Sequence, residues 1–197
     1  LGKNKALISV FAGSRESEIK LLMPILLDFI KLMKQKYSDM TYVFHSTQNF
    51  SQLQQSLIKE KNLSNCEVIS DDKIKSHILQ KSIFAVTKSG TVSLEISNAK
   101  IPSIVFYKMG YINFLIVKSL VKTKYANIIN FAANEEIIPE LLQSKCNAKN
   151  IFDHVDSFLE NPDKINKQVE KVQSILNKLK TDKPSSELAS LALDKFL

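Results

Sequence analysis

Short apolar runs alternate along the chain with longer segments in which apolar residues recur every three to four positions. The short runs are rich in β-branched and aromatic residues and have little internal alternation, which is typical of strands buried on both faces of a sheet. We therefore expect strands at 6–11, 41–45, 66–70, 83–88, 101–108 and 125–129. The first helical pattern follows the first strand, with Ile19, Leu22, Met23, Leu26, Leu27, Ile30 and Met33 at helical spacing.

Helices are expected between the later strands as well. They fall at about 49–61, about 73–80, within SGTVSLEISNAK (89–100) and at about 111–121. From about residue 135 onward the strand pattern stops. Four segments there have helical patterns, namely EEIIPELLQ, AKNIFDHVDSFLE, DKINKQVEKVQSILNKLK and SSELASLALDKF.

This alternation of strands and helices indicates an α/β fold with an open, mostly parallel, Rossmann-like sheet and helices on both faces. Such sheets bind ligands beyond the carboxyl ends of their strands. We assign residues 1–145 to this α/β domain and residues 146–197 to a C-terminal helical tail. Because the sequence begins at Leu1 rather than methionine, we expect it to be a piece of a longer protein.

The charge is unevenly distributed along the chain. The formal net charge is +7, and the segment 96–134 contains five lysines and no Asp or Glu. Such a segment attracts phosphates or anionic lipid head groups, although a generally lysine-rich composition without any ligand is an open alternative. Nucleic acid is not expected as a partner, because no basic motif interleaved with aromatic residues occurs.

Metal and cofactor sites are not expected. Cys66 and Cys146 have no metal-ligand spacing, and the three histidines lie far apart in the sequence. The two cysteines are typical of buried thiols in a reducing compartment. The apolar run YINFLIV (111–117) is far shorter than the roughly 20 residues that a membrane-spanning helix needs.

The single arginine of the chain is the first candidate for chemistry. Arg15 stands among 26 lysines, directly after Gly13 and Ser14, where a strand turns into a helix. A guanidinium binds phosphate with two parallel hydrogen bonds, and free N–H groups at a helix start favour an anion. The alternative is a plain strand–helix turn capped by Ser14.

A second turn of the same kind follows the strand at 83–88. Ser89 and Thr91 offer hydroxyl groups, Gly90 frees the turn, and Thr91 is a candidate N-cap. Glu95 lies four residues after Thr91, on the same helix face, and could accept hydrogen bonds from two ribose hydroxyls. Taken alone, Glu95 is better explained as a surface glutamate favoured by the helix dipole.

The two turns together are more specific than either one. Both belong to one sheet, so their helix starts can converge on one crevice, where an arginine and an acid suit a pyrophosphate and its ribose. The pattern matches neither a P-loop nor G-x-G-x-x-G, so ATP and NAD are not proposed.

Five motifs occur in an order and spacing that resemble the lipid-A-disaccharide synthase family. They are AGSRESEI, SGTVSLE, IPSIVFYK, LVKTKYANIIN and PELLQ. The resemblance covers essentially the whole chain, as the C-terminal half of an enzyme with the two-domain GT-B fold. It implies a glycosyltransferase that moves 2,3-diacylglucosamine from UDP to 2,3-diacylglucosamine 1-phosphate, with this half binding the UDP part.

The resemblance also implies roles for individual residues. Arg15 would neutralise pyrophosphate charge as UDP leaves, without a metal or other cofactor, and Glu95 would hold the ribose. Asn130 matches an asparagine near the nucleotide, and Gln143, which ends PELLQ, is a weaker candidate. The remaining residues, which would line the phosphates, are Gly13, Ser14, Ser89, Gly90 and Thr91.

Two departures from the family pattern fall next to this site. The family has Leu-Pro where this chain has Phe11-Ala12, and Leu-Pro-Asn where it has Ile128-Ile129-Asn130. Losing two prolines would loosen two loops near the ligand. In the family, the N-terminal half carries the acceptor site and the general base. Asp71 and Asp72 could face the crevice, but nothing singles them out as that base.

The resemblance places the protein in the cytoplasm, at the inner membrane of a Gram-negative bacterium. The segment 96–134 would contact the anionic membrane surface, although a helix packed on the sheet explains its apolar stretch equally well. The tail at 146–197 would pack on the missing half or on a second subunit of a homodimer. Two other interpretations stay open: a non-catalytic UDP-binding module or subunit of a split glycosyltransferase, and a UDP-sugar epimerase of the same fold, which LVKTKYANIIN and PELLQ argue against.

Overall fold

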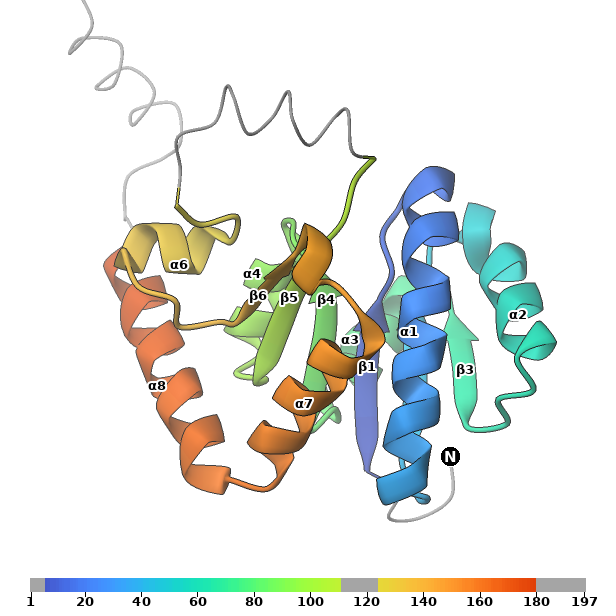
Figure 1. The fold of residues 1–197 in the computed structure, drawn as a ribbon. Coiled ribbons are helices and arrows are strands. Elements are labelled where there is room, and N and C mark those ends of the chain that lie inside the picture. Colours follow the sequence, from blue (N-terminus) through green and yellow to red (C-terminus); the bar gives the residue numbers. More distant parts are fainter. Residues whose placement is uncertain (1–5, 111–123, 180–197) are drawn as a thin grey trace, which may run out of the picture.

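The computed structural model describes residues 6–110 and 124–179 and shows one open sheet of six strands, all parallel (Figure 1). The strand order is β3-β2-β1-β4-β5-β6. The strands are β1 (Leu7–Phe11), β2 (Thr41–His45), β3 (Cys66–Ile69), β4 (Phe84–Lys88), β5 (Ser103–Tyr107) and β6 (Glu140–Leu142). The predicted Rossmann-like α/β fold is confirmed, and the order reverses direction between β1 and β4, where such sheets bind ligands.

Helices cover both faces of the sheet. One face carries α1 (Glu16–Lys36), α2 (Ser51–Glu60) and α7 (Ala148–Leu159), and the other carries α3 (Asp72–Gln80), α4 (Val92–Asn98) and α8 (Pro162–Leu179) (Figure 1). The remaining elements are α6 (Ile128–Ala133) and two short 3-10 turns, Gln48–Phe50 and Gln143–Lys145. None of the helices in the described part of the chain is long and apolar enough to cross a membrane.

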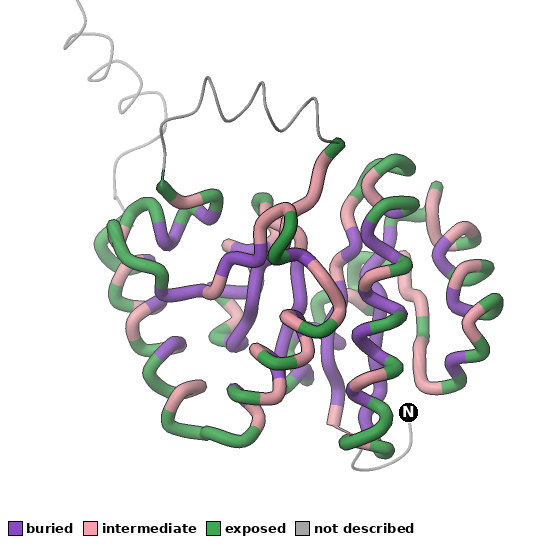
Figure 2. Tube along the Cα trace, viewed as in Figure 1, coloured by how far each residue is buried: buried purple, intermediate pink, exposed green. Residues whose placement is uncertain are grey.

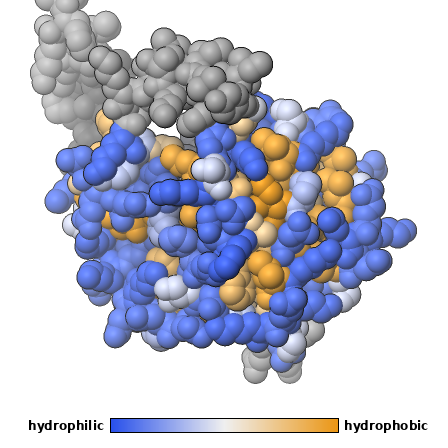
Figure 3. Space-filling view, in the orientation of Figure 1, coloured by the Kyte–Doolittle hydropathy of each residue, from blue (hydrophilic) through white to orange (hydrophobic). Residues whose placement is uncertain are grey.

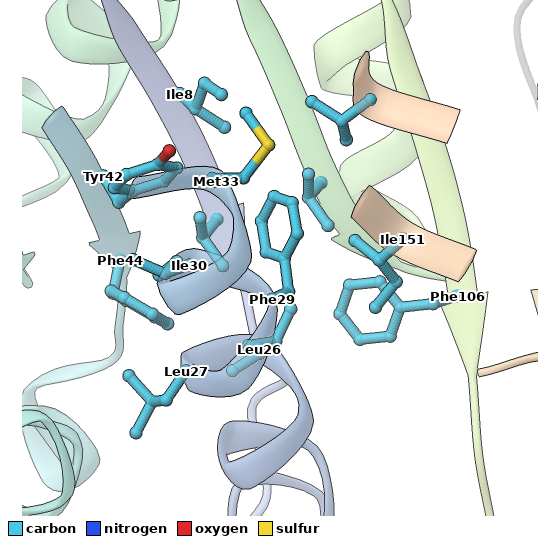
Figure 4. Close-up of a cluster of buried hydrophobic side chains, with 14 of the residues drawn as sticks. Ile8, Leu26, Leu27, Phe29, Ile30, Met33, Tyr42, Phe44, Phe106 and Ile151 are labelled. Carbon is cyan, nitrogen blue, oxygen red and sulfur yellow. The ribbon is translucent and has the colours of Figure 1, made fainter. Parts of the chain in front are cut away.

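The largest core cluster lies between the sheet and α1. Figure 2 shows that the central strands are buried along most of their length. The predicted apolar face of α1 packs on them, and Phe29 of the same helix meets Tyr42 in a T-shaped arrangement with 6.2 Å between ring centroids (Figure 4). Burying these large side chains is the main favourable contribution to folding. Outward, the same side of the molecule presents hydrophilic side chains interrupted by apolar patches (Figure 3).

The C-terminal helices pack on this chain's own sheet. Phe158 of α7 contacts Phe84 with 5.3 Å between ring centroids, and Tyr37 donates a hydrogen bond to Asp156. The side chain of Gln168, on α8, exchanges two hydrogen bonds with the backbone of Ser103 at the start of β5. These contacts do not test the predicted packing of 146–197 on the missing half or on a second subunit, which stays a prediction. Residues 180–197, with the helix expected in SSELASLALDKF, lie outside the described residues.

The sixth strand is not where the sequence predicted it. Residues 125–129 do not form a strand: Asn127 has extended backbone and its Oδ1 accepts from Ile129 N, so it caps helix α6. The local signal misled because Ile128 and Ile129 are β-branched, whereas in the structure Ile129 packs beside Val105 of β5 from a helix.

The expected helix in EEIIPELLQ is also wrong. Residues Glu140–Leu142 form the edge strand β6, parallel to β5. Pro139 disfavours a helical Ile138, and the Asn130 side chain binds the backbone N–H groups of Ile137 and Ile138, which removes them from helical bonding. The helix expected at 111–121 lies outside the described residues.

Candidate functional site

A cavity of about 830 Å³ lies at the carboxyl ends of β1, β2 and β4, bordered by α3 and α4. It sits beside the point where the strand order reverses. Six of the residues predicted from the two turns line it: Gly13, Ser14, Ser89, Gly90, Thr91 and Glu95. The structure therefore brings together residues that are separated by about eighty positions in the sequence.

The first turn is built around Gly13. Its φ of +112° lies in a region that residues other than glycine rarely adopt, so the backbone conformation requires glycine here. Ser14 N donates to Glu18 Oε2 at 3.2 Å, and Arg15 rather than Ser14 is the N-cap of α1. No side-chain hydrogen bond caps this helix, so the simple serine-capped turn does not occur here.

Two cations share one carboxylate at the start of α1. Glu18 Oε1 lies 2.9 Å from Lys88 Nζ and 3.7 Å from Arg15 Nη1. Burial raises the pKa of Glu18, but Lys88, Ser14 N and Arg15 outweigh it and hold this pKa below its usual range. Glu18 is therefore ionised, and the cluster of Arg15, Glu18 and Lys88 carries a net charge of +1.

Arg15 and Lys88 differ in how they face the cavity. The Arg15 side chain is 80% exposed and stands outside the cavity wall, whereas Lys88 lines the wall at 21% exposure and lies over the ring of Tyr107. Lys88 was not among the residues predicted from the sequence. The available signal was its position as the last residue of a buried strand, immediately before the second turn.

The second turn leaves its hydroxyl groups in different states. Thr91 is the N-cap of α4, as predicted, but its side chain makes no capping hydrogen bond. Ser89 Oγ donates to Ala126 O at 2.9 Å, which ties this turn to the segment before α6. Glu95 is exposed on the first turn of α4 and faces the cavity. Within the described residues, the side chains of Thr91 and Glu95 make no hydrogen bond that a ligand would have to break.

Asn130 lies away from the cavity and has a structural role. Its side chain is completely buried and makes four hydrogen bonds. The amide nitrogen donates to Ile138 O and Glu140 Oε1, and the amide oxygen accepts from the backbone of Ile137 and Ile138. A nucleotide could bind this amide only by displacing these partners.

Gln143 also lies outside the cavity wall. It adopts a left-handed backbone at φ 52°, and its Oε1 accepts from Met109 N at 3.2 Å. Within the described residues, its Nε2 is buried without a hydrogen-bond partner. Gln143 therefore joins the end of β6 to the segment after β5 rather than to the cavity.

The acidic pair after β3 serves the start of α3. Asp71 accepts from the backbone N–H groups of Lys73 and Ile74 and so caps this helix. Asp72 lines the cavity and forms an ion pair with Lys75 at 2.9 Å. Neither carboxylate has an environment that marks it as a general base.

Part of the cavity wall comes from β2, which held none of the residues predicted from the sequence. It includes His45, whose side chain is buried against Phe11 with 4.2 Å between ring centroids. Burial, helped by the charge of Lys75, lowers the pKa of His45 to about 4, so this imidazole is neutral at pH 7.

The two cysteines lie outside the cavity wall. Burial raises the pKa of Cys66 to about 12 and of Cys146 to about 11, so both thiols stay protonated.

The neutral state of His45 predicts an acid-sensitive fold. An unfolded histidine takes up its proton near pH 6.5, but the folded one does so only near pH 4, so the unfolded state binds more protons between these values. We expect the free energy of unfolding to fall by about 2 kcal/mol between pH 7 and pH 5 on this account. Urea denaturation at both pH values should show that His45→Phe reduces this loss. An identical loss in the variant would contradict the prediction.

The chain is similar to known proteins over most or all of its length. A family model described as lipid-A-disaccharide synthetase matches residues 1–195. Lipid-A-disaccharide synthase from Rickettsia prowazekii (strain Madrid E) is 32% identical over 200 residues, which cover 100% of this chain and 52% of that protein. The enzyme of the same name from Sulfurihydrogenibium sp. (strain YO3AOP1) is 33% identical over 165 residues, covering 80% of this chain and 42% of its own length. The chain thus spans about half the length of the curated relatives it matches.

Solved structures share the fold at low sequence identity. An O-GlcNAc transferase mutant from Thermobaculum terrenum has a TM-score of 0.61 at 12% identity, covering 97% of this chain and 35% of that one. UDP-GlcNAc 2-epimerase from Neisseria meningitidis has a TM-score of 0.58 at 15% identity, covering 91% and 46%. The fold is thus common to transferases and epimerases, and the family is decided by the sequence match over residues 1–195. On that match, the chain belongs to the lipid-A-disaccharide synthetase family.

Proposed function

We propose that this chain is the donor-binding half of a glycosyltransferase that moves 2,3-diacylglucosamine from UDP to 2,3-diacylglucosamine 1-phosphate, forming lipid A disaccharide and releasing UDP. The observation that carries the proposal is the convergence of both turns on one cavity, with Lys88 and Glu95 in its wall and Arg15 paired with the same carboxylate as Lys88. The family membership supports the reaction type, and the related Neisseria fold was solved with UDP-GlcNAc bound.

The residues around the cavity suit the parts of a nucleoside diphosphate. Gly13, Ser14 and the second turn would surround the diphosphate, since hydroxyl and backbone N–H groups bind phosphate oxygens. Arg15 and Lys88 would oppose the negative charge that develops on UDP as the glycosidic bond breaks, which is electrostatic stabilisation of the leaving group. Glu95 would accept hydrogen bonds from the ribose hydroxyls.

Acceptor binding and the general base are assigned to a part of the enzyme beyond this chain. Two observations support this division: the chain covers about half of each relative, and Asp71 and Asp72 are used in a helix cap and an ion pair. A non-catalytic UDP-binding module, or a subunit of a split enzyme, would have the same cavity. Transfer activity on addition of the N-terminal half of a relative would separate a donor half from a module that only binds.

Titration of the chain with UDP in a calorimeter tests the proposal. Arg15→Ala should weaken binding about ten- to a hundred-fold, because a charged bidentate contact contributes about 1.5–3 kcal/mol. Lys20→Ala is the matched control, since Lys20 is an exposed cation on the same helix that pairs with Glu16. Absence of UDP binding by the folded wild-type chain, or equal losses in both variants, would refute the donor site.

We also propose that the lysine-rich segment 96–134 brings the protein to the cytoplasmic surface of an anionic membrane. The described part of this segment supports it: Ile128 is 48% exposed and Phe131 is 59% exposed on α6, and Lys124 precedes this helix in the sequence. Apolar side chains beside cations favour the interface of anionic bilayers. Assembly into a homodimer through the C-terminal helices stays a prediction.

Vesicle co-sedimentation tests the membrane proposal. The chain should sediment with phosphatidylglycerol vesicles more than with phosphatidylcholine vesicles, and the difference should shrink in high salt because salt screens the charges. Ile128→Ser combined with Phe131→Ser should reduce the bound fraction several-fold at low salt. Binding that depends on neither lipid charge nor these two side chains would refute it.

A further inference from the structure

A chain of buried hydrogen bonds runs beneath the cavity from β2 to the end of α3. His45 Nε2 lies 2.8 Å from Ser9 Oγ, and Ser9 Oγ lies 2.7 Å from Ser82 Oγ. Ser82 Oγ in turn lies 3.0 Å from the carbonyl oxygen of Ile78. The three side chains are nearly inaccessible to solvent, at 6%, 0% and 8% exposure.

All three contacts can be hydrogen bonds at the same time in only one direction. A carbonyl oxygen can only accept, so in that arrangement Ser82 donates its single hydroxyl proton to Ile78 O. Ser9 must then donate to Ser82, and its own oxygen is left to accept from His45. The proton of the neutral imidazole is therefore on Nε2, and Nδ1 is a hydrogen-bond acceptor.

The imidazole is also held in position. Phe11 stacks on it with an angle of 20° between the ring planes, and both rings line the cavity. Within the described residues, Nδ1 has no hydrogen-bond partner, and it is not among the side-chain atoms closed off from solvent without one. A fixed, proton-free acceptor is thus available at the β2 wall of the cavity.

The position of this acceptor indicates which part of a nucleotide it would contact. A diphosphate has no donor at neutral pH, so it would not approach Nδ1, and the cations and the two turns lie at β1 and β4. Glu95, the acceptor suited to ribose hydroxyls, follows β4. The β2 wall lies on the opposite side of β1 from β4, which leaves the base to be placed there.

We infer that His45 is a specificity-determining residue that accepts a hydrogen bond from the N3–H of a uracil base. This inference rests on the proposed function, because it requires a uridine nucleotide in the cavity. Uracil presents a donor at N3, whereas cytosine presents an acceptor at that atom and would face the Nδ1 lone pair. The hydrogen bonds through Ser9 and Ser82 to Ile78 O would thus determine which base is preferred, because they determine which nitrogen of His45 carries the proton.

A methyl group on the base tests this contact. UDP and N3-methyl-UDP are titrated against the wild-type chain and against His45→Phe, which keeps a planar ring and removes the acceptor. The wild-type chain should bind UDP about five- to ten-fold more tightly than the methylated nucleotide, since one hydrogen bond contributes about 0.5–1.5 kcal/mol. His45→Phe should bind UDP more weakly and lose this preference, and its melting curve shows whether it is folded.

Each outcome decides between the inference and the proposed function. Equal preference in wild type and His45→Phe would mean that the methyl group is rejected sterically, and would overturn the inference while leaving UDP binding intact. No preference in the wild type would do the same. Failure of the wild-type chain to bind UDP would overturn the proposed function and the inference with it.

The ¹⁵N chemical shifts of His45 provide an independent test. They should show a proton on Nε2 in the wild type, and a mixture of the two tautomers in Ser9→Ala. A proton on Nδ1 in the wild type would overturn the inference.

Discussion

Replacing Asn130 with alanine is expected to lower the free energy of unfolding by about 3–5 kcal/mol, because several buried polar groups lose a partner at once and each costs about 1–3 kcal/mol. These groups are the backbone N–H groups of Ile137 and Ile138, the carbonyl of Ile138 and the carboxylate of Glu140. In the variant, the Glu140 carboxylate still accepts hydrogen bonds from the backbone N–H groups of Ala126 and Asn127. The edge strand β6 should loosen most, and urea denaturation measures the loss.

The matched control is Asn177→Ala. Asn177 is exposed on α8, so its replacement should change stability by no more than about 0.5 kcal/mol. The comparison also separates two roles for Asn130. If Asn130→Ala were as stable as the wild type but bound UDP much more weakly, the family-based assignment of Asn130 to the nucleotide would be right and the structural role wrong.

Gly13→Ala is expected to destabilise the fold by about 2–3 kcal/mol, since a side chain at φ +112° strains the backbone and the new methyl group collides with a neighbour. A Cβ at this position would lie 2.6 Å from Glu18 Oε2. The Glu18 carboxylate would have to move away from Ser14 N and Lys88, which it now holds. The variant should therefore also bind UDP more weakly than the wild type.

Gly90→Ala offers a control from the second turn. A Cβ at Gly90 would meet no atom of the described residues within 4 Å, so stability should change by no more than about 0.5 kcal/mol. Thermal or urea denaturation of both variants provides the comparison. Equal losses of stability would show that the conformation of Gly13 and its contact with Glu18 do not matter for folding.

The central strands and α1 could be predicted from the sequence because their signals are local and strong. The runs that became β1, β2 and β4 are mostly apolar, and the apolar positions of α1 repeat at helical spacing over about four turns. The turns at Gly13 and Gly90 could be predicted for the same reason, since a glycine between a strand and a helix has few other uses.

The segment 125–142 could not be predicted because its conformation depends on contacts that are not local. Asn127 and Asn130 divert a β-branched run into a helix, and the Asn130 side chain then extends the backbone that becomes β6. Likewise, the local signals of Lys88 and His45 were too weak to single them out, since a lysine at a strand end and a lone histidine are common. Their importance follows from Glu18 and from Ser9, which lie 70 and 36 residues away in sequence.

The fold class, the family and the two turns could be inferred before any contact was known, because they follow from the order of local patterns along the chain. The folded structure then established which residues share the cavity, how Glu18 joins two cations, and which buried side chain His45 bonds. It also decided that Asn130 supports the fold from outside the cavity. These properties depend on distances and on hydrogen-bond directions between segments, and both are set only when the strands pair and the helices pack.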